Sequence, residues 1–230
     1  MAAGSTHGRM SALLVLSIAV TVLAVASMAS ARDSVTIDGN GDLTAANGVT
    51  GGSGTASDPY VIEGLDITGT EDHCIFLNDT DSHVVIRGMD LSSTDGTYMG
   101  IRLEHASNVT IRDLTTFNLS RCLVAKWCED VAVENVSSRR GVLDFSWTDG
   151  ILVDGFRFEH FHGGPYDDGL MVYVSTNATV VNCTFEGVYR AIRIGTASDV
   201  RVHDNAMRNV SYGVTADKST YGENHNVWVE

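Results

Sequence analysis

The chain has 230 residues and a formal net charge of −14, and it contains 23 glycines, 2 prolines and only 7% aromatic residues. This length suits a single domain with a substantial core, and the composition favours strands and turns over helices. The negative charge argues against nucleic acid, whose phosphates attract basic surfaces, and against docking on an anionic membrane.

Residues 1–31 have the features of a signal peptide. Arg9 is their only charge, the apolar run "MSALLVLSIAVTVLAVAS" follows it, and "ASA" at 29–31 is a small-x-small cleavage pattern. We therefore expect a secreted or cell-surface protein whose mature chain begins at Arg32. An uncleaved membrane anchor is the alternative, because the apolar run is near the length that spans a bilayer. Residues 32–58 then form a lead-in or cap, and 59–230 form the main domain.

One short pattern recurs along the rest of the chain, as in "SDPYVIEGLDI" (57–67), "SHVVIRGMDL" (82–91) and "SNVTIRDLTT" (107–116). Apolar residues alternate within each copy, which predicts a strand with one buried face. The clearest inward column is Ile62, Ile86, Ile111, Val133, Val153, Val180, Val202 and Val229. Two residues later most copies have Gly, Asn or Asp, which tolerate a left-handed backbone bend: Gly64, Gly88, Asp113, Asn135, Gly155, Asn182 and Asp204.

A second strand is predicted later in each copy, always after a small residue: Cys74, Gly100, Cys122, Gly141, Gly169, Ala191 and Gly213. The copy "GVLDF" breaks this pattern, because Asp144 would point inward unless that strand slips by one residue. Repeats of 20 to 28 residues with no helical period predict a solenoid. The fold class is therefore all-β, a right-handed single-stranded parallel β-helix of about eight rungs, each rung being one turn of the chain, with a short N-terminal cap.

The C-terminal end of the sequence bears on this prediction as well. Val229 belongs to an inward column and no capping sequence follows it. We therefore expect a fragment that lacks its C-terminal rungs, and the alternative is a last rung that pairs with a partner.

The repeats resemble those of pectate-lyase-like β-helix proteins. The lead-in "GVTGGSGTASDPYVIEGLDI" is similar to the start of archaeal surface proteins with a NosD-like domain, the periplasmic copper-binding β-helix family. The resemblance implies the fold and an extracytoplasmic location. It implies no reaction, because this fold hosts lyases, hydrolases, adhesins and binding proteins.

Three charged residues are candidates for catalysis. "GPYDDG" places Asp167 and Asp168 together, and polygalacturonase-like hydrolases use paired carboxylates as acid and as activator of water. However, the spacing separates Asp168 from Asp149 along the coil, so the two should not meet on one face. Lys126, on the rung after Glu104, is the candidate base of a lyase, and an ordinary exposed ion pair between these two explains the pattern equally well.

Aromatic residues on or just after the second strand are the candidates for ligand binding. Exposed aromatic rings beside arginine suit sugars, whose apolar faces stack while their hydroxyls form hydrogen bonds. The alternative is that these rings pack under the insertions at 92–99 and 159–168. The candidate substrate-binding residues are Trp127, Phe145, Trp147, Tyr173, Arg102 and Arg193.

The sequence commits to no cofactor and no metal site, and calcium and copper are left open. His160 and His162 lie two apart, but no third copper ligand is evident. The four cysteines lack the spacing of a zinc site or disulfide framework and read as buried, unreactive thiols. Of seven N-x-[ST] sequons, Asn78, Asn118 and Asn209 are the glycosylation candidates, because the other four coincide with turn positions.

The sequence as a whole favours an exported carbohydrate-binding or structural protein with no recognisable catalytic set. Its expected partners are a glycan, a polysaccharide or surface-layer components, and its oligomeric state is left open. The alternatives are a polysaccharide lyase or glycoside hydrolase acting on acidic glycans and a periplasmic copper-binding protein.

Overall fold

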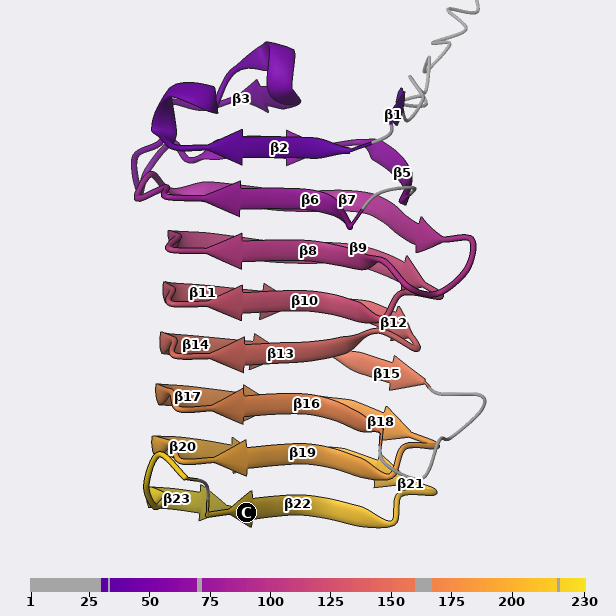
Figure 1. Ribbon diagram of the computed structural model, residues 1–230, viewed down its shortest axis with the longest axis vertical. Coiled ribbons are helices and arrows are strands. Elements are labelled where there is room, and N and C mark those ends of the chain that lie inside the picture. The colour runs from indigo at the N-terminus through magenta and orange to yellow at the C-terminus, as the bar shows by residue number, and fades with distance from the viewer. Residues whose placement is uncertain (1–29, 33, 70–71, 160–166, 219) are drawn as a thin grey trace, which may run out of the picture.

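The computed structural model describes residues 30–32, 34–69, 72–159, 167–218 and 220–230. Within them the chain coils about one axis, and successive rungs stack along it (Figure 1). Viewed from its N-terminal end, the chain turns clockwise as it moves away from the viewer, so the coil is right-handed. The predicted right-handed parallel β-helix is confirmed.

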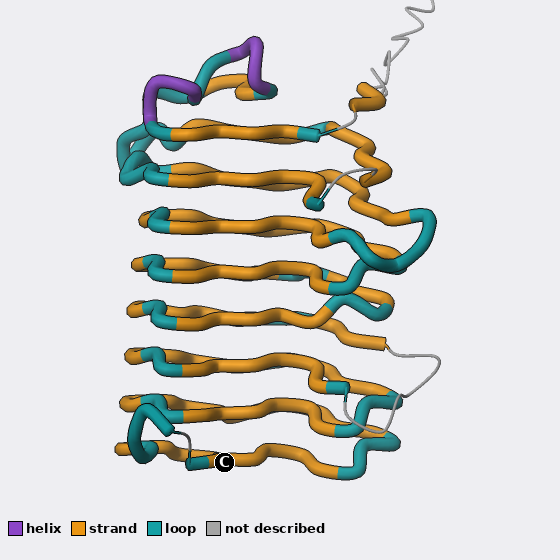
Figure 2. The backbone as a smooth tube through the Cα atoms, in the orientation of Figure 1, coloured by secondary structure: helices purple, strands orange, loops and turns teal. Residues whose placement is uncertain are grey.

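One face of the coil is an eight-stranded parallel sheet, which corresponds to the eight expected rungs. Its strands, in spatial as well as chain order, are β2 (Val35–Asp38), β6 (His73–Asn78), β8 (Met99–Glu104), β10 (Arg121–Lys126), β13 (Val142–Ser146), β16 (Asp168–Tyr173), β19 (Arg190–Gly195) and β22 (Tyr212–Asp217). The strands from β8 to β19 end in tight turns at one edge, while longer loops lie at the other edge (Figure 2).

The chain returns through a second, 15-stranded sheet. Its strands are β1 (Ser30–Arg32), β3 (Val49–Gly51), β4 (Tyr60–Glu63), β5 (Leu65–Gly69), β7 (Val84–Ser93), β9 (Ser107–Phe117), β11 (Glu129–Glu134), β12 (Ser137–Arg139), β14 (Asp149–Asp154), β15 (Arg157–Glu159), β17 (Thr176–Val181), β18 (Thr184–Glu186), β20 (Ser198–His203), β21 (Ala206–Arg208) and β23 (His225–Val229). The sheet bends where the Gly, Asn and Asp column was expected, with φ from +51° at Asn135 to +70° at Gly155.

The core lies between the two sheets. The inward column from Ile62 to Val202 is buried, whereas Val229 on the last strand is 54% exposed. The small residues of the other sheet leave no room for side chains, since a Cβ on Gly100 would lie 2.6 Å from the carbonyl oxygen of Cys122. Close backbone contact between rungs therefore explains that column.

Strand β13 slips by one residue relative to β10, because Cys122 has no partner in it: Arg121 pairs with Val142, but Leu123 pairs with Leu143. The slip turns Asp144 outward and Phe145 inward, where its side chain is fully buried. The hydrophobic pattern sets this register, because the alternative would bury a carboxylate. Phe145 was therefore wrongly expected to bind ligand, since a ring in the core cannot contact one on the surface.

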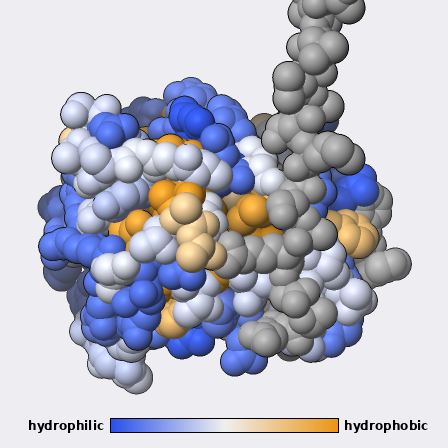
Figure 3. Space-filling model, turned by 90° about the horizontal axis from the view of Figure 1, so that it is seen from above, coloured by the Kyte–Doolittle hydropathy of each residue, from blue (hydrophilic) through white to orange (hydrophobic). Residues whose placement is uncertain are grey.

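The N-terminal end of the core is covered by the segment between β2 and β4. The 3-10 helices η1 (Asn40–Asp42) and η2 (Ala45–Asn47) precede β3, which pairs antiparallel with β4, and Leu43 and Val49 are buried in the core. Seen from this end, polar residues surround a smaller apolar area (Figure 3).

The expected signal peptide lies outside the described residues, apart from Ser30 and Ala31, which begin β1. In the described ranges no helix has the length and apolar character needed to cross a membrane.

Candidate functional site

Six strands of the eight-stranded sheet are followed directly by a residue other than glycine in the left-handed backbone region. Most residue types adopt this conformation only at a cost, and for a β-branched residue it is an outlier. The residues at this position, with φ between +49° and +54°, are Asp79, His105, Trp127, Trp147, Val174 and Thr196.

Three of these side chains, on consecutive rungs, stack into what we call the aromatic ladder: His105, Trp127, Trp147 and, from the segment before β23, Tyr221. The centroids of His105 and Trp127 are 5.2 Å apart with nearly parallel planes, and those of Trp127 and Trp147 are 5.7 Å apart. Tyr221 packs edge-on against Trp147 at 6.0 Å. Since parallel rings in contact are about 3.5–4.0 Å apart, the two indoles are offset and part of each face stays open.

The ladder is exposed to solvent: the exposed fractions are 48% for Trp127, 38% for Trp147 and 63% for Tyr221. Trp127 and Trp147 directly follow the C-terminal ends of β10 and β13, whereas the insertion at 92–99 precedes the N-terminal end of β8. The alternative in which these two rings pack under the insertion at 92–99 is therefore wrong, whereas most of the insertion at 159–168 lies outside the described residues.

A hollow of about 240 Å³ lies on the outer face of the eight-stranded sheet, next to the ladder. We call it the sheet hollow, and it is lined by Asp144, Ser146, Met171, Val172, Tyr173 and Arg193. The ring of Tyr173 contacts Tyr221 at 6.3 Å, and Ser146 is followed directly by Trp147. The hollow and the ladder are therefore parts of one continuous surface.

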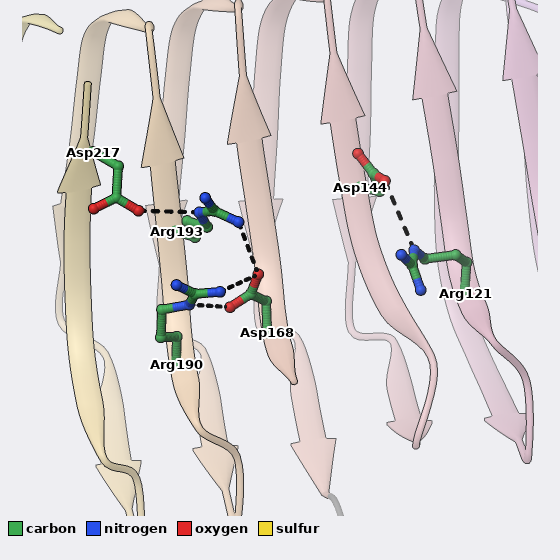
Figure 4. A network of polar contacts seen from close by, with 6 residues as sticks. All are labelled: Arg121, Asp144, Asp168, Arg190, Arg193 and Asp217. Carbon is green, nitrogen blue, oxygen red and sulfur yellow. Dashed lines mark hydrogen bonds and ion pairs between the residues drawn. The ribbon is translucent and has the colours of Figure 1, made fainter. Parts of the chain in front are cut away.

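Ion pairs run across the same face and form what we call the ion network (Figure 4). The guanidinium of Arg190 donates to both carboxylate oxygens of Asp168, at 2.5 and 3.3 Å. Arg193 lies 3.7 Å from Asp168 and donates to Asp217 at 3.1 Å. The hydrogen bond to Asp168 raises the pKa of Arg190, so the cation is held more firmly than usual.

A further pair belongs to the ion network, because Arg121 lies 3.7 Å from Asp144 and Ser146 also donates to that carboxylate at 3.1 Å. Asp144 and Arg193 lie on either side of β16 (Figure 4). With three arginines and three aspartates, the network is neutral in a protein of net charge −14.

The structure does not unite the three candidate catalytic residues. Lys126 aligns through Ser146 with Tyr173, at the opposite end of β16 from Asp168. Two strand spacings and five residues along the strand separate their Cα atoms by about 19 Å. Asp168 is 7% exposed and bound to arginine, and the neighbouring Asp167 accepts a backbone hydrogen bond from Arg190. An acid–base set of Lys126, Asp167 and Asp168 is therefore excluded.

The two candidate arginines have different surroundings. Arg193 lines the sheet hollow, whereas Arg102 lies on β8, with its guanidinium 5.2 Å from the ring centre of Phe76 and 2.6 Å from Glu104. Glu104 is opposite Lys126 in register, as expected, but its carboxylate pairs with Arg102 on its own strand. Arg102 aligns through Val124 with Asp144, two strands away, and is not among the residues that line the sheet hollow.

Several residues of this surface were not among the sequence candidates, including His105, Asp144, Arg190, Asp217 and Tyr221. Asp144 had a signal, since it broke the inward pattern of its rung. Tyr221 had none, because the segment before β23 has no counterpart in the other rungs. Only the folded chain brings its ring against Trp147.

The described residues contain no group of three or more His, Cys, Asp or Glu side chains able to hold a metal ion. His160 and His162 lie outside them. All four cysteines are buried and free, and burial raises the pKa of Cys74 and Cys183 to about 11 and that of Cys122 to about 12.

The three sequon asparagines differ in how their amides are engaged, and their glycosylation stays a prediction. Asn118 donates to the carbonyl of Ser93 at 2.9 Å and accepts from Arg140 at 2.7 Å. Asn78 donates to Asp38 at 2.8 Å. Asn209 is exposed. A glycan joined to the amide nitrogen would cost these bonds at Asn118 and Asn78.

Similarity to solved structures is limited to overall shape. A glycosyl hydrolase of Parabacteroides merdae, described as putative, is 12% identical, with a TM-score of 0.45, over 63% of this chain and 79% of its own. An alginate lyase of Paenibacillus is 11% identical, with a TM-score of 0.44, over 85% and 99%. The A-module of a mannuronan C-5 epimerase of Azotobacter vinelandii is 14% identical, with a TM-score of 0.40, over 65% and 53%.

A comparison with curated proteins gives no significant match. A family model described as "Right handed beta helix region" matches residues 52–229, which is most of the chain. It spans the stacked rungs, including the ladder and the sheet hollow. The chain belongs to the right-handed β-helix family.

Proposed function

We propose that this protein binds carbohydrate on its eight-stranded sheet, along the aromatic ladder and the sheet hollow. The observation that carries the proposal is the placement of Trp127 and Trp147 at left-handed turn positions. This conformation costs about 1–2 kcal/mol for residues other than Gly, Asn and Asp. A strained backbone that presents exposed aromatic rings is typical of a functional surface.

The chemistry of the surface matches that of a sugar. Open parts of the indole faces offer apolar contact to the C–H faces of a pyranose. In the hollow, Tyr173 and Met171 provide apolar walls, while Asp144 and Arg193 provide an acceptor and a donor for hydroxyl groups. Export through residues 1–31, which we propose as a signal peptide, would place this surface among extracellular polysaccharides or surface-layer components.

Binding rather than cleavage is the function that the described residues support. Glycoside hydrolysis needs two carboxyl groups on either side of the bond, and Asp144 is the one carboxylate lining the sheet hollow. Asp168 is occupied by two arginines. We therefore expect a bound glycan to be released unchanged.

The test uses Trp127→Asn and Trp147→Asn with a panel of oligosaccharides, measured by calorimetry and by product analysis. We expect each variant to lose at least tenfold in affinity. The free energy of unfolding should change by no more than about 1 kcal/mol, because relief of the strained backbone offsets the lost stacking. A purely structural ladder would instead lower stability and leave affinity unchanged.

Trp228→Ala is the matched control, since Trp228 is 46% exposed but lies on β23, in the other sheet. It should retain full affinity. Unsaturated or shortened products in any reaction would overturn the non-catalytic assignment. Failure of every glycan to bind would overturn the proposed function.

A further inference from the structure

We infer that the unit bound in the sheet hollow is an uncharged sugar, not a uronate or a sulfated sugar. The inference rests on the proposed function and names the substrate class of the same site. It comes from the way the charges around the hollow are already paired.

Arg193 is the cation of the hollow, and an anionic sugar would have to use it. Its Nε donates to Asp217 at 3.1 Å, and its Nη1 lies 3.7 Å from Asp168. Asp168 is itself fixed by Arg190 and is only 7% exposed. An incoming carboxylate would therefore have to compete with two resident carboxylates that are attached to the sheet.

Asp144 makes the opposite wall unfavourable for an anion as well. Its carboxylate lines the hollow two strands from Arg193, about 10 Å away at the spacing of a sheet. Arg121, which pairs with it at 3.7 Å, is not among the residues lining the hollow. A uronate held at Arg193 would therefore face a like charge across the hollow, within a protein of net charge −14.

Hydroxyl groups can bind without displacing a resident carboxylate from its arginine. Because a hydroxyl group is both a donor and an acceptor, one sugar hydroxyl can donate its O–H to Asp144 while another accepts an N–H of Arg193. Charged partners strengthen both hydrogen bonds, and every resident ion pair stays intact. The volume of the hollow, about 240 Å³, is that of about eight molecules in liquid water, which is comparable to the volume of one sugar unit.

The adjoining surface extends the proposed binding site from one sugar unit to an oligosaccharide. Tyr173 lines the hollow and its ring touches Tyr221, which packs on Trp147. Along the strand, Asp144 and Trp147 are three residues apart, about 10 Å. We therefore expect one neutral unit in the hollow and its neighbours on the aromatic ladder.

The experiment compares hexasaccharides of neutral sugars (cello-, xylo-, manno- and laminari-oligosaccharides) with oligogalacturonate and oligoalginate of equal length. Affinity is measured by calorimetry at 20 and 500 mM NaCl. We expect a neutral hexasaccharide to bind with a Kd that changes less than twofold with salt, and the anionic ones to bind at least tenfold more weakly. If an anionic hexasaccharide binds as tightly as the neutral hexasaccharide of highest affinity, the inference is overturned but the proposed function stands. Absence of all binding overturns both.

Asp144→Asn tests the local charge directly, because it keeps the shape and an acceptor oxygen. The variant should raise affinity for the anionic hexasaccharides at least fivefold and lower affinity for the neutral ones, because a neutral amide accepts a weaker hydrogen bond from a hydroxyl than a carboxylate does. Asp113→Asn is the control with the same change in net charge, at a bend on the other sheet where asparagine is used by other rungs. Equal effects of the two substitutions on anionic affinity would show that net charge alone acts, and would overturn the role of the hollow.

Discussion

At the scale of single residues, the turns that follow six strands of the eight-stranded sheet carry a conformational cost. Asp79 fits the left-handed backbone because its short polar side chain hydrogen-bonds locally. Trp127, Trp147, Val174 and Thr196 have φ near +50° without that compensation. The tryptophans are explained by the proposed binding surface, whereas Val174 has no ring that could join the aromatic ladder.

Val174→Asn should therefore stabilise the protein. Valine is β-branched, and its left-handed conformation at φ +49° is a genuine outlier. Asparagine accepts the conformation, so we expect the free energy of unfolding to rise by about 1 kcal/mol, read from denaturant midpoints. Val172→Asn on the same strand is the contrasting variant, because Val172 is fully buried and an unpaired amide there costs several kcal/mol. A lower midpoint for Val174→Asn would contradict this account of strain.

The buried thiols make stability depend on pH in the alkaline range. Burial raises the pKa of Cys74 and Cys183 to about 11 in the folded protein, whereas in the unfolded chain it is about 8.5. The folded state therefore binds the protons more tightly. The stabilisation is complete below about pH 8.5 and is lost as pH rises toward 11.

The measurement is the unfolding midpoint between pH 7 and 11, together with thiol labelling by a disulfide reagent at pH 8. We expect the midpoint to fall across the upper part of this range and all four cysteines to react only in denaturant. Rapid labelling of Cys122 in the folded state would show that its burial, and hence the close contact between rungs, is wrong.

At the scale of elements, the register of β13 decides what the sheet presents to solvent. The one-residue slip against β10 places Asp144 beside Arg121 and buries Phe145. Without the slip, the sheet hollow would lose its acidic wall and the core would gain a carboxylate. The strand start at Gly141 makes the slip sterically feasible, because a Cβ there would lie 2.6 Å from the backbone nitrogen of Cys122.

Gly141→Ala should consequently destabilise the protein. The added methyl group meets backbone, which cannot move aside as a flexible side chain could, and overpacking of this kind costs about 1–3 kcal/mol. Gly41→Ala is the control, since a Cβ there has no neighbour within 4 Å, and it should stay within about 0.5 kcal/mol of the parent. Thermal unfolding of the two variants side by side gives the comparison. Equal stability of the Gly141 variant and the parent would refute the tight contact.

At the scale of the whole molecule, like charges oppose the stacking of rungs. Each rung contacts its neighbours along the axis, so the net charge of −14 is distributed along a rod. The ion network is locally neutral and partly buried, which makes it less sensitive to salt than the exposed surface. Repulsion between exposed carboxylates is therefore the larger salt-dependent contribution.

We expect the thermal midpoint to rise between 10 and 500 mM NaCl, because screening weakens this repulsion. Potassium chloride should act alike, since screening does not distinguish the two cations. A midpoint that falls with salt would mean that exposed ion pairs, such as Arg87 with Glu63 at 2.7 Å, outweigh the repulsion.

The coil follows from patterns that lie within each copy of the repeat. Alternating apolar residues, the bend residues and the small-residue column recur in each copy, and each acts within its own rung through side-chain alternation, left-handed backbone and close packing. The ladder was partly predictable for the same reason, because Trp127 and Trp147 occupy equivalent places in consecutive copies.

The alignment of neighbouring rungs depends on the tertiary packing between them. The slip of β13 buried Phe145 and turned Asp144 outward, and the approach of Tyr221 completed the ladder. The Cα atoms of Lys126 and Asp168 are separated by two strand spacings and five residues along the strand, about 19 Å, and this distance likewise follows from register. These features arise between segments far apart in the chain. Their register is set by competition among alternative packings of neighbouring rungs, which a pattern confined to one rung does not specify.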